Sequence, residues 1–221
     1  MFIIYIKIWI IAFASLFQTD EPTFKGGATG LNNFIASNLI YPGFSKNNCI
    51  QGTIYVAFQV NKSGVVFNST VQKGLGVDLD NEALRLVRLT NNKWTVPSNH
   101  NTNTRLVIPV NFSLKNYNCN ERSSDQINQA IALYQSRLAL EKAVINYYKN
   151  KAAGKANEQD ETEIILLKNE LGFDDKFIAQ ELKMAKQKIK QGDKEGACES
   201  LYFVKYIGST AADLLIAENC K

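Results

Sequence analysis

The sequence predicts an α+β fold, in which a three-stranded antiparallel sheet with two helices is followed by an all-α region. Three observations lead to this prediction. Apolar and polar residues alternate over short segments between residues 51 and 114, which is typical of strands with one face on a core. From residue 123 onward the apolar residues recur at helical spacing instead. The charge balance changes as well, because residues 1–119 carry 10 basic and 5 acidic side chains and residues 120–221 carry 15 and 16.

The first half is expected to begin with a helix and a hairpin. Apolar residues at helical spacing predict a helix over residues 31–39, which stops before Pro42 because proline cannot continue a helix. Strict alternation predicts strands over residues 51–60 and 65–71. The residues between them, 61–64, have the composition of a tight turn, so the two strands are expected to form a β-hairpin.

A second helix and a third strand complete the predicted sheet. Asp80 is a candidate N-cap for a helix of about three turns, and alternation predicts a strand over residues 105–114. If the helix crosses over the sheet with the usual handedness, the third strand lies beside the first and the strand order is 2-1-3. Pro109 agrees with an edge position for the third strand, because a residue without an N–H is confined to edge strands or bulges.

The chain has four cysteines, and the predicted topology pairs them. The start of the first strand lies beside the end of an antiparallel third strand, which brings Cys49 close to Cys119. The last two predicted helices are antiparallel and joined by a short loop, which brings Cys198 towards Cys220. None of the cysteines has the C-x-x-C spacing of a zinc or redox site. Two disulfides and no metal site are therefore expected.

The second half is expected to be a bundle of short-looped helices. Asp193 follows Gly192 and is a candidate N-cap, as is the acidic pair at Asp174. Residues 185–212 resemble half-repeats of tetratricopeptide-type helical hairpins, although no fixed period is present. With the first half at residues 22–116 and this region at 123–221, two domains are predicted. The helices are predicted over residues 123–151, 163–171, 177–191, 195–207 and 210–219.

The extreme N-terminus has the pattern of an export signal. Residues 2–17 are almost wholly apolar, with Lys7 inside the run, and the run contains the small-x-small pattern at Ala12 to Ala14. A signal peptide cleaved after Ala14 is the first interpretation, and retention of residues 1–17 as a short membrane anchor is the alternative. Export places the cysteines in a compartment where disulfides persist. Contact with the membrane is expected only if this segment is retained.

Composition excludes several classes of site. His100 is the only histidine, so sites that need several imidazoles are not available, and the sequence predicts neither a catalytic site nor a cofactor. A net charge of +4 is too small for a nucleic-acid-binding protein. His100 lies among asparagines in a polar loop and is interpreted as a solvated side chain, whereas Trp94, between a helix and a strand, is expected to fill the core.

The first half also resembles a known family. Over about 90 residues it is similar to the C-terminal domain of TonB, the periplasmic energy-transducing protein of Gram-negative bacteria. The matching positions are Pro22, Phe24, Gly26-Gly27, Phe34-Ile35, Asn38-Leu39, Tyr41-Pro42, Gln51-Gly52, Ser63-Gly64, Lys73-Gly74, Leu79-Asp80, Glu82-Ala83, Lys93-Trp94, Pro97 and Ile108-Pro109-Val110-x-Phe112.

The resemblance implies a function for the edge strand. In this family the third strand pairs with a short extended segment, the TonB box, of an outer-membrane transporter, and a free strand edge is a template for such pairing. The resemblance thus implies a periplasmic, non-enzymatic binding module in TonB-dependent transport, or one anchored to the inner membrane and facing the periplasm. The residues expected to bind the transporter or another extended peptide are Arg105, Leu106, Val107, Ile108, Val110, Asn111 and Phe112.

An alternative function follows from the helical region. The region comes directly after the third strand, so it could cover the edge of that strand, and the protein would then be an exported scaffold whose helices bind another protein. Self-association is a further expectation, because unpaired strand edges also pair with one another.

Overall fold

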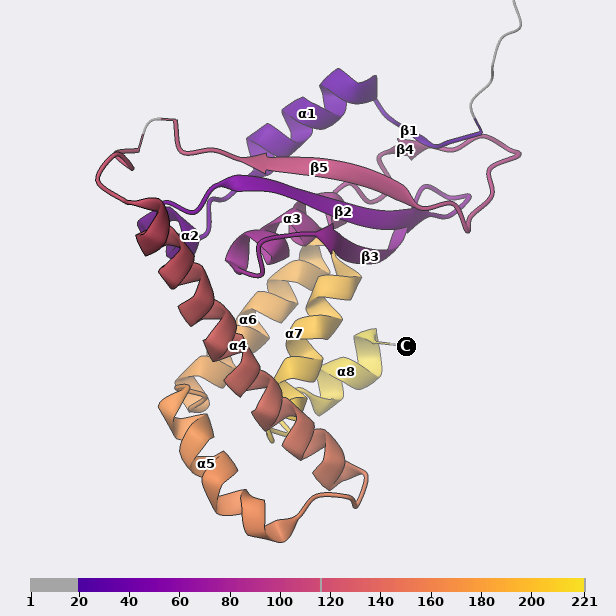
Figure 1. Cartoon of the computed structure of the whole chain (residues 1–221). Coiled ribbons are helices and arrows are strands. Elements are labelled where there is room, and N and C mark those ends of the chain that lie inside the picture. Colours follow the sequence, from indigo (N-terminus) through magenta and orange to yellow (C-terminus); the bar gives the residue numbers. More distant parts are fainter. Residues whose placement is uncertain (1–19, 116, 221) are drawn as a thin grey trace, which may run out of the picture.

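The computed structural model describes residues 20–115 and 117–220, and its architecture is α+β with a helical C-terminal region (Figure 1). In chain order the elements are β1 (Thr23–Phe24), α1 (Gly27–Asn38), α2 (Gly43–Asn47), β2 (Gly52–Val60), β3 (Val66–Lys73), α3 (Asp78–Arg88), β4 (Trp94–Thr95), β5 (Leu106–Phe112), α4 (Ser124–Ala152), η1 (Glu158–Asp160), α5 (Glu161–Glu170), α6 (Asp175–Gln191), α7 (Lys194–Tyr206) and α8 (Asp213–Asn219).

The main sheet has the predicted strand order. Its three strands are arranged β3-β2-β5 with both pairs antiparallel, so the first predicted strand is central and the third lies at an edge. Pairing of β2 with β5 runs without interruption from Gly52 opposite Phe112 to Phe58 opposite Leu106. The pairing of β2 with β3 contains register shifts. The short strands β1 and β4, which form a separate two-stranded sheet, and the short helix α2 were not predicted.

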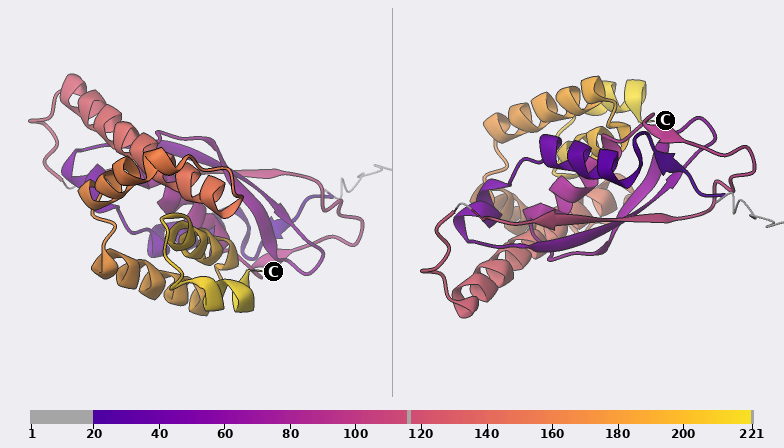
Figure 2. Two further views of the ribbon diagram at one scale, coloured as in Figure 1. Left: turned by 90° about the horizontal axis from the view of Figure 1, so that it is seen from below. Right: turned by 90° about the horizontal axis from the view of Figure 1, so that it is seen from above.

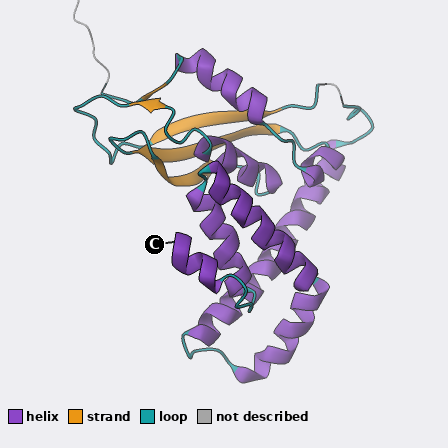
Figure 3. Ribbon diagram, turned by 180° about the vertical axis from the view of Figure 1, so that it is seen from behind, coloured by secondary structure: helices purple, strands orange, loops and turns teal. Residues whose placement is uncertain are grey.

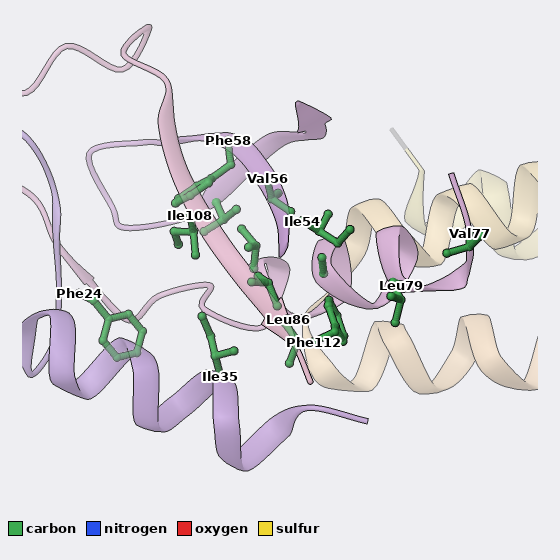
Figure 4. Packing of buried hydrophobic residues seen from close by; sticks show 14 of the residues in the cluster. Phe24, Ile35, Ile54, Val56, Phe58, Val77, Leu79, Leu86, Ile108 and Phe112 are labelled. Carbon is green, nitrogen blue, oxygen red and sulfur yellow. The ribbon is translucent and has the colours of Figure 1, made fainter. Parts of the chain in front are cut away.

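The first hydrophobic core lies between the sheet and the helices α1 and α3. Figure 4 shows side chains from all three sources packed together. Ile54, Val56 and Phe58 of β2 are fully buried because alternate strand residues share one face. Trp94 is also buried in this core, as predicted, and its indole N–H donates to the Thr90 hydroxyl. Phe112 and Ile108 attach β5 to the same core.

A second hydrophobic core holds the helical region together. It is formed by residues of α4, α6 and α7, with the loops and α8 closing one end, and it includes Phe173, Leu201 and Val204. The five predicted helices are present, with ends shifted by at most three residues. Asp174 and Asp193 cap α6 and α7 as expected, since their carboxylates accept the N–H groups of Phe177 and Gly196.

Helix α4 contributes to both cores. Ala130 is buried in the first core, whereas Val144 is buried in the second. The helix descends from the sheet along the helical region in Figure 1 and in the view from behind (Figure 3), and in the view from below it runs in front of the sheet (Figure 2, left). The proposed domain boundary between residues 116 and 123 stays a prediction, and packing continues across it.

Both predicted disulfides are present. Cys49 is bonded to Cys119, and Cys198 is bonded to Cys220, each with a Cα–Cα distance of 5.6 Å. The first bond joins the chain just before β2 to the chain after β5. The second joins α7 to the end of α8.

Two interpretations of single residues were wrong. His100 is buried with 3% of its surface exposed, because its ring lies between two backbone carbonyls: Nδ1 is 3.1 Å from the Asp20 oxygen and Nε2 is 2.9 Å from the Val60 oxygen. Asp80 does not precede α3. It lies in the first turn, where its carboxylate accepts the N–H groups of Leu75 and Gly76 from the incoming loop.

The predicted signal peptide or anchor at residues 1–17 lies outside the described residues. Within residues 20–115 and 117–220, no helix is both long enough and apolar enough to cross a membrane.

Candidate strand-addition edge

The candidate site is the outer side of β5, which is free of strand pairing. In the described part of the chain β5 pairs only with β2, so one of its two sides has no neighbouring strand. In Figure 1 this side is the upper border of the sheet, on the opposite side from the helical region. A strand in this position has a row of backbone donors and acceptors that another chain can use.

Pro109 identifies which backbone groups point outward. Proline lacks an N–H, so it fits a regular ladder where its nitrogen faces away from the neighbouring strand. Residues of the same parity, Val107 and Asn111, then point their N–H and C=O groups to the free side as well. The N–H of Leu114, which has the opposite parity, donates to the Gln51 side chain on the β2 side. The free edge thus offers two N–H donors and three carbonyl acceptors.

The side chains of the predicted binding residues divide between two faces of the sheet. Those of Ile108, Val110 and Phe112 are buried in the core, and Leu106 is partly buried there. Their side chains point into the core, and their N–H and C=O groups face β2 because their parity is opposite to that of Pro109, so none of these four residues offers a hydrogen-bonding group to a partner on the free side. Val107 lies on the opposite face, where 44% of its surface is exposed. The other exposed side chains among the predicted residues are Arg105 and Asn111.

The exposed face of the sheet is polar and positively charged. Arg105 donates to the Thr70 hydroxyl at 2.5 Å, and Thr53 contacts the Asn111 side chain at 3.2 Å. The Lys73 ammonium lies 6.0 Å from the centre of the Tyr55 ring. None of the residues in β2, β3 and β5 is acidic. A negatively charged side chain would therefore be attracted to this face.

The other edge of the sheet is covered by the helical region. The backbone N–H of Ser69 on β3 donates to the Glu195 carboxylate of α7 at 3.2 Å, and the Ser69 hydroxyl contacts the same carboxylate. Closer to the start of β3, the N–H of Val66 donates to the Asn91 side chain at 3.1 Å. Side chains thus occupy outward donors on β3, whereas the outward donors of β5 have no such cap among the described residues.

Arg88 fixes this cover in place. Its guanidinium, at the end of α3, donates to both carboxylate oxygens of Glu199 at 2.7 and 2.6 Å and to the Ser69 hydroxyl at 2.7 Å. Burial disfavours its charge, but the carboxylates of Glu199, Asp193 and Glu195 outweigh burial and raise the pKa of Arg88 above its usual value. Burial raises the pKa of Asp193 despite its bond from the Gly196 N–H.

A comparison with known protein families gives a match that includes β5. Residues 37–114 match the family described as Gram-negative bacterial TonB protein C-terminal, a range that begins within α1 and includes all of β5. Residues 37–114 are therefore similar to the C-terminal domain of TonB proteins. No curated protein and no solved structure matches the chain significantly.

The match to the TonB C-terminal family implies a role in TonB-dependent transport for this part of the chain. It is a family of energy-transducing, protein-interacting domains that face the periplasm and interact with outer-membrane transporters. The helical region from α4 to α8 lies outside the matched residues.

The contact between the TonB-type domain, the name used here for the part of the chain that contains residues 37–114, and α7 was not predicted from the sequence. Arg88 has the position of an ordinary basic residue in the last turn of a helix, where it favours the helix dipole. Its partner Glu199 is 111 residues further along the chain. No local pattern carries this information, because the pairing depends on how the helical region folds back against β3.

Proposed function

We propose that this protein is a binding module of TonB-dependent transport, in which the outer side of β5 accepts an extended segment of an outer-membrane transporter as an additional strand. Main-chain hydrogen bonds to Val107, Pro109 and Asn111 would give affinity, as in other complexes formed by strand addition. Side chains next to the edge, above all Arg105, Val107 and Asn111, would select among segments.

The observation that carries the proposal is the difference between the two edges of the sheet. On β3 the Ser69 N–H is occupied by Glu195, whereas β5 is uncapped in the described residues. The cover supplied by the helical region therefore leaves one edge for a partner. The positive charge of Arg105 and Lys73 also favours a segment that carries an acidic residue.

The experiment is an NMR titration of the ¹⁵N-labelled protein with a synthetic peptide from the periplasm-facing segment of a TonB-dependent transporter. Strand addition predicts the largest amide shifts at Val107 and Asn111, whose N–H groups point outward, and smaller shifts at Ile108 and Val110. The matched control is the same peptide with methyl groups on the backbone nitrogens that face β5, which removes the donors that strand pairing needs. Shifts confined to the helical region, or none at all, would contradict the proposal.

A second candidate function is a scaffold whose helical region binds another protein. The observation in its favour is the buried Arg88 contact, which joins that region firmly to the TonB-type domain. In this proposal the helical region is the recognition surface and strand addition at β5 does not occur. The same titration separates the two functions, because a scaffold leaves the β5 amides unchanged.

A further inference from the structure

A cleft of about 750 Å³ lies between the TonB-type domain and the helical region. Its lining residues come from α3, α4, α6 and α7, with Pro42 just before α2 and Asp193 just before α7. In Figure 3 these helices converge beneath the sheet. A concave site between two packed units, with apolar walls and a few polar groups, is a common place for a small ligand.

The cleft has apolar walls. Leu84 of α3, Ile145 of α4 and Phe203 of α7 all line it, and each is partly buried. Each comes from a different helix, so a short hydrocarbon chain in the cleft would meet apolar surface on several sides. The face of the Phe203 ring also attracts cations.

Most of the charged groups in the cleft already have partners. Arg85 donates to both Glu82 oxygens, Arg88 is bonded to Glu199, and the Lys188 ammonium donates to the Ser200 hydroxyl at 2.9 Å. The Lys142 side chain is exposed at the cleft border. Carboxylates thus neutralise Arg85 and Arg88, whereas the Lys188 ammonium donates to two neutral groups, the Ser200 hydroxyl and the Gly196 carbonyl.

Glu181 of α6 is the exception. It lines the cleft and is partly buried, yet it takes part in none of the ion pairs found among the described residues. Burial raises the pKa of its carboxyl; the charge of Lys188 opposes this rise and that of Glu141 adds to it. A cation that bound beside Glu181 would favour the ionised carboxylate.

We propose that this cleft binds a small aliphatic amine, whose ammonium group pairs with the Glu181 carboxylate and whose hydrocarbon chain lies against Leu84, Ile145 and Phe203. Charge complementarity to Glu181 and the apolar walls select this class of ligand. An anion or a neutral alcohol lacks the charge, and an inorganic cation lacks the hydrocarbon chain. The site is independent of the β5 edge, because it lies on the other side of α3 from the sheet.

The test is a titration of the full chain with 1,4-diaminobutane, followed by methyl NMR of Leu84 and Ile145. The expected result is a saturable shift of both methyl signals. Glu181→Gln keeps the size of the side chain and is expected to weaken binding at least tenfold, and 1,4-butanediol at the same concentrations should give no saturable shift. The matched control is Glu170→Gln on α5, where the carboxylate is exposed and lies outside the cleft, and it should bind the diamine like the unaltered protein.

Three outcomes would overturn the proposal. They are equal affinity in Glu181→Gln, equal losses in Glu181→Gln and Glu170→Gln, and shifts that grow linearly without saturation. The ligand-free methyl spectrum of Glu181→Gln checks that the cleft is intact. If that spectrum differs from the unaltered one, competition of sodium chloride against diamine binding replaces the variant, and affinity that does not fall with salt would contradict pairing with a carboxylate.

Discussion

The two edges of the sheet differ in whether their outward N–H groups have hydrogen-bond partners. On β3, which borders the helical region, outward N–H groups are occupied by Asn91 and Glu195, and the buried Arg88 guanidinium orients the acidic groups around them. On β5 the outer side is left without a strand or cap in the described residues, and a proline interrupts its row of donors. The helical region thus restricts where a partner strand can pair, because without its cover the edge at β3 would also be open to other chains.

The largest expected effect concerns how β5 is held at its end. Replacing Cys49 and Cys119 by serine removes a bond across a sequence separation of 70 residues, which chain-entropy arguments put at about 4 kcal/mol of unfolding free energy. Urea unfolding measures the loss of stability, and amide hydrogen exchange should become faster in β5 by a larger factor than in β3. The control is Cys198→Ser with Cys220→Ser, where the separation is 22 residues: a loss of about 3 kcal/mol with unchanged exchange in β5 is expected.

The second prediction removes the cover from β3. Arg88→Ala leaves the Ser69 hydroxyl and the acidic groups without their buried partner, and it should lower the unfolding free energy by about 2–3 kcal/mol, less than for a fully buried pair because 60% of the Glu199 side chain is exposed. The amide of Ser69 should exchange faster and the protein should self-associate at high concentration.

Arg105→Ala is the control for this change. Arg105 is exposed and bonds only to Thr70 among the described residues, so its loss should cost less than about 0.5 kcal/mol. Equal stability of the two arginine variants, or unaltered exchange at Ser69 in Arg88→Ala, would show that the cover of β3 does not depend on the guanidinium.

The third prediction removes an outward donor from β5. Asn111→Pro deletes one N–H on the free side, and losing one hydrogen bond of about 0.5–1.5 kcal/mol should weaken binding of a transporter peptide roughly threefold to tenfold. Fluorescence anisotropy of a labelled peptide measures it. Asn111→Ala keeps the N–H and removes the contact with Thr53, so it should bind within about twofold of the unaltered protein. Equal loss in both variants would assign the effect to the side chain.

The smallest effect at neutral pH concerns Tyr41, which packs edge-on against Phe112 at the end of β5 and donates to the Ile50 carbonyl at 2.6 Å. Burial, with the Asp78 charge, raises the pKa of Tyr41 to about 12. Because the pKa is higher in the folded state, the stabilisation is complete below pH 10 and is lost as the pH rises through 12. Ultraviolet titration should show tyrosinate absorbance that develops near pH 12 and is lost in Tyr41→Phe, and equal late absorbance in the two proteins would contradict it.

The order of the strands and the cysteine pairs could be predicted from local signals. Alternation fixed which side chains of β5 face the core, and Pro109 marked the edge, because both properties belong to a single strand. The cover of β3 could not be predicted in the same way. Ser69 and Glu195 are 126 residues apart, and neither has an unusual neighbourhood in the sequence. Their contact follows from the way in which the two hydrophobic cores pack against each other.

The burial of His100 is a second feature that the local sequence does not predict. A histidine among asparagines has the composition of a solvated loop, and yet the ring is buried between carbonyls supplied by Asp20 and Val60. Those carbonyls belong to backbone that any residue could provide. Composition therefore gives no sign of them, and the burial is visible only after the N-terminal segment is placed beside the end of β2.

The bond between Cys49 and Cys119 has a mechanical consequence. A transporter segment that was pulled along β5 would exert force on the C-terminal end of that strand. The covalent bond transfers this force to the start of β2, so the two neighbouring strands are pulled as a unit and the ladder between them is not peeled apart one bond at a time. Cys119 lies between β5 and α4, so a pull on the strand reaches the paired sheet before it reaches the start of α4.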